Sequence, residues 1–114
     1  GAGGTAVNYV YIAGPYSSGD VAVNVWSAVQ AANRLLDAGY KPYVPHLTHF
    51  WHIITPRPRE DWLHLDIDWL LKCDAVIRLD GASRGADVEV QWASEYKIPV
   101  YYGVDAFFQA EGVV

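Results

Sequence analysis

Residues 7–15 read V-N-Y-V-Y-I-A-G-P, a β-rich run that stops at a Gly-Pro pair. This stretch decides the fold, because it predicts a first strand over 7–13 with a loop at its carboxyl end. Strand and helix patterns then alternate along the chain. Further strands are expected at 41–44, 75–79 and 98–102, helices at 20–38, 60–73 and 84–97, and a short helix in the tail. Three prolines and three histidines among aromatic residues predict a loop over 45–58.

Strands that alternate with helices imply a parallel sheet with helices on both faces. The expected fold is α/β, a three-layer α/β/α, flavodoxin-like, doubly wound sheet of four or five strands in the order 2-1-3-4(-5). This order puts the carboxyl ends of strands 1 and 3 side by side, which is where such folds bind ligands. The two loops that meet there begin at Gly14 and Asp80.

Length and composition limit the classes of function. The 114 residues suit one domain, expected over 7–114, with residues 1–6 as a flexible tail or the remnant of a tag. The formal charge of −5 argues against a nucleic-acid partner, and no apolar run approaches the ~18 residues of a membrane span. Cys73 is the only cysteine, so no intramolecular disulfide can form and a reducing, cytoplasmic location is expected.

Two carboxylates lie on apolar helix faces. At 100° per residue, Asp66 shares a face with four apolar residues, whereas Asp68 falls on the opposite side near Lys72. Glu89 likewise shares a face with small and aromatic residues. Each acid has an ordinary explanation as a local cap or ion pair. A pair of carboxylates meeting at one site is also what glycoside-type chemistry uses, one at the anomeric carbon and one for the leaving group's proton.

Three segments carry a family resemblance: Tyr11-Ile12-Ala13-Gly14-Pro15, the helix end Asp66-Ile67-Asp68-Trp69-Leu70-Leu71-Lys72-Cys73-Asp74, and Ser83-Arg84-Gly85-Ala86-Asp87-Val88-Glu89-Val90-Gln91-Trp92-Ala93. Together they resemble the nucleoside 2-deoxyribosyltransferase superfamily, which includes the 2′-deoxynucleoside 5′-monophosphate N-hydrolases and the CMP hydrolases. The resemblance covers roughly residues 7–102 and implies a single nucleoside 2-deoxyribosyltransferase-like domain.

The resemblance implies a role for each matching residue. Glu89 is the expected nucleophile at C1′, Asp66 assists at the base or the sugar, and Tyr11 orients the glutamate and borders the sugar. Ser83 stands where the monophosphate hydrolases have a phosphate-binding serine, although an ordinary helix N-cap would also explain it. The expected substrate contacts are Gly14, Pro15, Ser17, Ser18, His46, Ser83, Arg84 and Gly85. No metal or organic cofactor is expected.

The aromatic segment over 45–58 allows several interpretations. His46, His49 and His52 are spaced by threes, which makes a metal site conceivable. Stacking on a nucleobase is a better expectation than a metal site. Packing of an oligomer interface is as good an expectation as stacking. The family resemblance implies a homodimer or a larger homo-oligomer.

The two carboxylates and the family resemblance together predict an enzyme that cleaves the N-glycosidic bond of a (deoxy)nucleoside 5′-monophosphate. The reaction would pass through a glycosyl-enzyme intermediate on Glu89 and release the free base. One alternative is a nucleoside 2-deoxyribosyltransferase that exchanges bases. Another is a nucleotide-binding sensor of the same fold without turnover, and a third is an assembly module with an aromatic surface.

Overall fold

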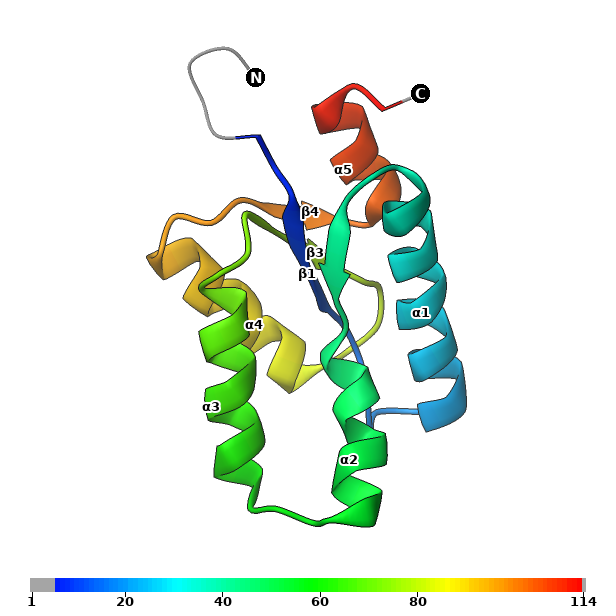
Figure 1. The fold of residues 1–114 in the computed structure, drawn as a ribbon, viewed down its shortest axis with the longest axis vertical. Helices are drawn as coiled ribbons and strands as arrows, with labels where there is room; N and C mark the ends of the chain where they lie inside the picture. Colours follow the sequence, from blue (N-terminus) through cyan, green and yellow to red (C-terminus); the bar gives the residue numbers. More distant parts are fainter. Residues whose placement is uncertain (1–5, 114) are drawn as a thin grey trace.

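The computed structural model describes residues 6–113, so the tail expected at 1–6 falls almost wholly outside the described residues. Residues 6–113 form four strands, a 3₁₀ helix and five α-helices (Figure 1). In chain order these are β1 (Tyr9–Ala13), α1 (Val21–Asp37), β2 (Lys41–Tyr43), η1 (Pro45–Leu47), α2 (Thr48–Ile54), α3 (Arg59–Leu70), β3 (Ala75–Arg78), α4 (Arg84–Glu95), β4 (Val100–Tyr102) and α5 (Val104–Glu111).

The sheet is wholly parallel, with the strand order β2-β1-β3-β4. The predicted α/β class, flavodoxin-like architecture and strand order are confirmed. Residues 6–113 contain four strands and no fifth, because the tail after β4 turns at once into α5. The expected strands are each one or two residues too long, since the ends of the apolar runs lie in the loops.

The strand β1 lies in the middle of the sheet and separates two layers of core. Val10 and Ile12 point to the layer beneath α1 and α5, whereas Tyr11 and Ala13 point to the layer beneath α3 and α4. All four side chains are fully buried. In Figure 1, α1 and α5 lie on one side of the sheet, and α3 and α4 lie on the other. The domain is therefore three-layered, as predicted.

The prediction of a loop over 45–58 is wrong, because most of this segment is helical. Pro45 begins η1, a position where its missing N–H has no cost, and α2 follows directly. The other two prolines of the segment, at 56 and 58, come only after α2 has ended. The true loop is 55–58, which joins α2 and α3 into a helical hairpin below the sheet (Figure 1). Within residues 6–113, no helix combines the length and apolar character needed to cross a membrane.

Candidate active site

A pocket of about 930 Å³ opens at the carboxyl ends of β1 and β3. The loop after β1 contributes Gly14, Tyr16, Ser17 and Ser18 to its wall, and the start of α4 contributes Ser83, Arg84 and Gly85. The hairpin of η1, α2 and α3 supplies the opposite wall, with His46, His49, His52 and Trp62. The pocket is thus at the switch point that the strand order predicts.

Glu89 reaches this pocket from the second turn of α4. Its Oε2 accepts a hydrogen bond from the Tyr11 hydroxyl, which rises from the buried layer of β1. Burial raises the pKa of Glu89 to about 7; the Tyr11 hydrogen bond opposes this rise, Asp66 adds to it, and Arg78 opposes it. Burial also raises the pKa of Tyr11, with Glu89 as the next contributor, so the phenol stays protonated and can only donate to the carboxylate.

Asp66 reaches the same pocket from the third turn of α3. Burial raises its pKa to about 7, and the nearby Tyr43 hydroxyl partly offsets the rise. Among residues 6–113, the buried Oδ1 of Asp66 has no hydrogen-bond partner. Tyr43 stacks on Trp69 of α3 with ring centroids 5.2 Å apart. A half-buried carboxyl with an unpartnered oxygen is suited to hold a proton for a ligand.

His46 is buried in the pocket wall, at 5% exposure. Its Nε2 lies 3.1 Å from the carbonyl oxygen of Pro15, and a carbonyl can only accept, so Nε2 carries the proton. Burial lowers the pKa of His46, which favours the neutral ring. Its Nδ1 is then an acceptor, and it has no partner within the described part of the chain. The Tyr16 hydroxyl is unpartnered there too.

The start of α4 presents free amides to the pocket. Ser83 is the N-cap, and its Oγ accepts a hydrogen bond from the amide of Ala86 at 3.1 Å. The ordinary explanation of Ser83 as a cap is therefore correct, and its hydroxyl proton remains available to donate. The amides at the first positions of a helix have no partner within the helix, so those of Arg84 and Gly85 can bind an anion.

The two loops at the mouth of the pocket pack tightly against each other. A Cβ at Gly14 would lie 3.0 Å from the Cβ of Leu79, and one at Gly81 would lie 2.8 Å from the Cγ of Pro15. Gly81 also has a φ of +110°, which other residues rarely adopt. The side-chain amide of Asn24 donates to the carbonyls of residues 16 and 18, at 2.8 and 2.7 Å. These contacts fix the loop after β1.

The histidines do not converge as metal ligands would. His52 Nδ1 accepts hydrogen bonds from Trp62 Nε1 at 2.9 Å and from the amide of Arg57 at 3.2 Å, so it joins α2 to α3. The His49 ring lies 5.2 Å from that of Tyr16, and His46 is engaged by Pro15. Within residues 6–113, no group of three histidine, cysteine or acidic residues could hold a metal ion. The rings of His46, His49 and His52 instead belong to an aromatic wall of the pocket.

Most of the residues expected from the sequence line one pocket. These are Gly14, Ser17, Ser18, His46, Asp66, Ser83, Arg84, Gly85 and Glu89. Two residues stand behind the wall instead. Tyr11 is fully buried beneath Glu89, so it can orient the glutamate but does not border the pocket, and Pro15 is buried with its carbonyl turned to His46.

Several wall residues were missed by the sequence interpretation. Tyr16 lies in the loop after β1 between Pro15 and Ser17, two expected substrate contacts, and its aromatic ring was the available signal. Trp62 lies one turn before Asp66 and is one of the four apolar residues on the helix face of Asp66. Tyr43 does not line the pocket, but its hydroxyl lowers the pKa of Asp66. It is in register with Tyr11 on the adjacent strand, so the two side chains share a face of the sheet. This pairing had no signal in the local sequence.

Residues 8–103 match the family described as Domain of unknown function (DUF7768). The chain belongs to this family. The match extends from the start of β1 to the end of β4, so the DUF7768 domain includes every element that lines the pocket. No curated protein matches the chain.

The DUF7768 domain is also similar to a solved structure, the crystal structure of a conserved protein from Enterococcus faecalis V583. The two share 26% sequence identity and superpose with a TM-score of 0.63, and the match covers 83% of this chain. This chain spans 62% of the length of that protein. The similarity supports the observed architecture of the DUF7768 domain.

Proposed function

We propose that this protein cleaves the N-glycosidic bond of a nucleoside 5′-monophosphate and releases the free base. The observation that carries the proposal is the meeting of Glu89 and Asp66 in one pocket, with the Tyr11 hydroxyl bonded to Glu89. The three motifs that resemble the nucleoside 2-deoxyribosyltransferase superfamily contribute these same three residues. A pair of acids with raised pKa values in a pocket is typical of a catalytic site.

The surroundings of the two acids suggest different roles at neutral pH. Both have a pKa of about 7, so near neutral pH the expected state has one of the two carboxyls protonated and the other ionised. The Tyr11 hydroxyl and the Arg78 charge favour the anion at Glu89, whereas Asp66 has an oxygen without a partner among residues 6–113. Glu89 is therefore the nucleophile and Asp66 the acid, because their different surroundings favour the anion at one carboxyl and the protonated form at the other.

The reaction would proceed in two steps. In the first, an oxygen of Glu89 bonds to C1′ while the C1′–N bond breaks, its electron pair goes to the base, and Asp66 donates its proton to the base. In the second, water attacks C1′ and gives a proton to Asp66 as the bond to Glu89 breaks. The products are the free base and the sugar 5-phosphate, and both carboxyls return to their starting states.

The substrate's two ends have separate places in this proposal. The phosphate would lie at the start of α4, where the free amides, the Ser83 hydroxyl and the Arg84 side chain favour an anion. The base would lie against the aromatic wall of His46, His49 and Trp62, where rings can stack and the free Nδ1 of His46 accepts a hydrogen bond.

The test is the release of base from a panel of nucleosides and 5′-monophosphates, separated by chromatography. Wild type should release base, and Glu89→Gln should not. Glu95→Gln is the matched control, because it makes the same change on an exposed residue of the same helix. Release by wild type and Glu89→Gln alike would rule out the nucleophile, and tight binding without release would favour the sensor.

A second free base added to the same reaction distinguishes hydrolysis from transfer. A new nucleotide carrying the added base would identify a base-exchanging transferase, whereas the sugar phosphate alone would identify a hydrolase. Either product requires the same intermediate on Glu89.

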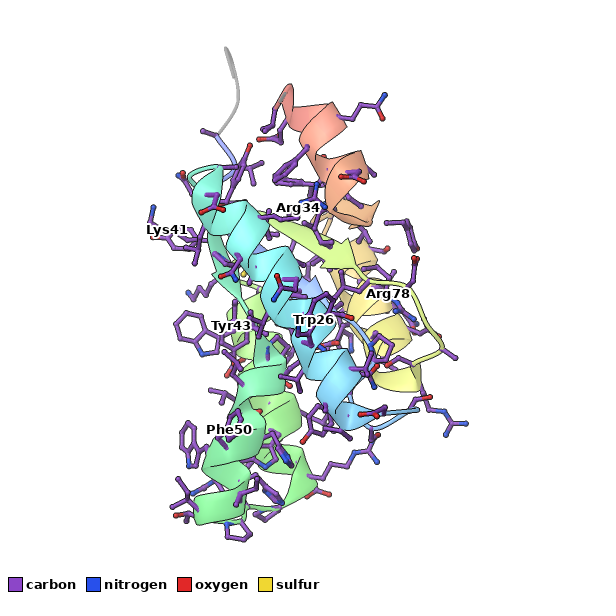
Figure 2. All side chains as sticks on the ribbon, turned by 90° about the vertical axis from the view of Figure 1, so that its right-hand side faces the viewer. Trp26, Arg34, Lys41, Tyr43, Phe50 and Arg78 are labelled. Carbon is purple, nitrogen blue, oxygen red and sulfur yellow. The ribbon has the colours of Figure 1, made fainter. Side chains whose placement is uncertain are left out.

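We further propose that the protein acts as a homodimer or a larger homo-oligomer. Four large apolar side chains stand exposed on α2, one helix of the hairpin that forms a wall of the pocket: Phe50, Trp51, Ile53 and Ile54. Figure 2 shows Phe50 on the outer side of α2. Such a patch is typical of an interface. Sedimentation of wild type should show an oligomer, and Ile54→Glu should shift it toward the monomer.

A further inference from the structure

Arg78, the last residue of β3, is a buried arginine beside the pocket. It is only 8% exposed, although a guanidinium is always charged and carries five N–H donors. A charge in such a place is retained only where acceptors surround it. Figure 2 places Arg78 next to α4, on the opposite side of the molecule's centre from the hairpin.

The acceptors of Arg78 all belong to the segment that leads into the pocket. Its Nη1 donates to the carbonyl oxygen of Leu79, and its Nη2 donates to the carbonyl oxygen of Gly81 at 2.9 Å. Nη2 also forms an ion pair with Asp87 in the first turn of α4, at 3.1 Å. One planar side chain thus joins the end of β3, the loop 79–83 and the first turn of α4.

The same segment carries the groups that the proposed reaction uses. Ser83 and Arg84 stand at its end, and Glu89 follows on the next turns of α4. On the outer side, the loop is held by the close approach of Gly81 to Pro15. The loop is therefore clamped between the loop after β1 and the Arg78 guanidinium, and its position sets where α4 begins.

The charged and titratable groups that face Glu89 come from four strands and helices. Tyr11 on β1 and Arg78 on β3 lower the pKa of Glu89, whereas Asp66 on α3 raises it. Glu89 in turn contributes to the raised pKa of Tyr43 on β2. The Tyr11 hydrogen bond opposes the rise in the pKa of Glu89 most strongly, and Arg78, the one cation in this set, opposes it as well.

We propose that Arg78 is a positioning residue whose fork of donors fixes the loop 79–83 and the first turn of α4. From this place its charge also favours the anionic form of Glu89. The link to catalysis rests on the proposed function. The role itself is a property of the folded protein and can be measured without turnover.

The test separates the fork from the charge with two variants. Arg78→Gln keeps a polar side chain and loses the charge, whereas Arg78→Lys keeps the charge and loses the planar fork. Arg34→Gln is the matched control, because Arg34 pairs with Asp105 on the far side of the sheet and does not line the pocket (Figure 2).

The carboxyl carbon of Glu89, assigned by its absence in Glu89→Gln, is followed by NMR as the pH is raised. In Arg78→Gln the titration midpoint of Glu89 should rise, because the protein loses a cation that favours the anion of Glu89. In Arg78→Lys and Arg34→Gln it should match wild type. Amide hydrogen exchange should be faster over 80–86 in Arg78→Lys and unchanged there in Arg34→Gln.

An unchanged Glu89 midpoint in folded Arg78→Gln would overturn the electrostatic role. Exchange at the wild-type rate over 80–86 in Arg78→Lys would overturn the structural one. If Arg78→Gln does not fold, Arg78→Lys decides alone: a midpoint more than about half a unit from wild type, or unchanged exchange, refutes the proposal. If wild type releases no base from any nucleotide, the proposed function fails, and these measurements still decide the role of Arg78.

Discussion

Replacing Tyr11 with phenylalanine removes one hydroxyl from the buried layer of β1 and changes almost nothing in shape. The hydroxyl donates to Oε2 of Glu89, and this bond lowers the pKa of a carboxyl that burial raises to about 7. Without it, the anion of Glu89 loses a hydrogen-bond donor while the protonated form loses little. The pKa of Glu89 should therefore rise in Tyr11→Phe.

The size of the effect follows from the charge on the acceptor. A hydrogen bond to a charged group contributes about 1.5–3 kcal/mol, which corresponds to about 1–2 pH units in the pKa of Glu89. At pH 7 the anionic fraction would fall from about one half to between about one tenth and one hundredth. If the anion is the nucleophile, kcat/KM at pH 7 should fall about 5- to 50-fold.

The assay is the pH profile of base release, measured as kcat/KM from pH 5 to pH 10. The acidic limb should move to higher pH in Tyr11→Phe, and the rate should approach that of wild type at the alkaline end. Tyr9→Phe is the matched control, because Tyr9 lies on the same strand with its side chain half exposed. An unmoved acidic limb in Tyr11→Phe would refute the assigned role of the hydrogen bond.

Three further predictions concern stability and reactivity. Burial raises the pKa of Glu89 from 4.5 to about 7, so the wild-type protein loses folding stability as the pH rises through this range. In urea unfolding, Glu89→Gln should therefore be more stable than wild type at pH 8, by up to about 3 kcal/mol. Below pH 4.5 the two proteins should be equally stable. A gap that does not depend on pH contradicts this. Gly81→Ala should lower the free energy of unfolding by about 1–3 kcal/mol. The loss should exceed that of Gly103→Ala, because Gly103 has a similar φ but a Cβ there would meet no neighbouring atom. Equal losses would show that the contact with Pro15 does not matter. Burial raises the pKa of Cys73 to about 12, so a thiol reagent at pH 8 should label it only after unfolding, and rapid labelling of the folded chain would show that Cys73 is accessible.

The strand order could be predicted because each strand has a clear local signal. The run ending at Gly14-Pro15 and the strand ending before Asp80 are separated by helical patterns, which forces parallel pairing. The helix α2 could not be recognised from composition, because three prolines dominate the segment. Their positions were more informative than their number, since no glycine or proline occurs between Pro45 and Pro56.

The site was only partly predictable for a related reason. Asp66 and Glu89 break the apolar stripe of a helix, so the helical period alone makes them visible. Tyr43 depends on the register between β1 and β2, and the partners of Arg78 depend on how a loop folds back over β3. Such long-range pairings have no period in the sequence, and only the three-dimensional structure shows them.

Tyr11 belongs at once to the packed interior and to the acid in the cavity above it. The layer that it shares with Leu70, Val76 and Ala93 cannot be redesigned for heat resistance as if it were inert filling. Any substitution in this layer that tilts the Tyr11 ring also changes the pKa of Glu89, because the Tyr11 hydroxyl donates a hydrogen bond to that carboxyl. In this small domain, a change that alters the packing of the core around Tyr11 therefore also alters the protonation of Glu89.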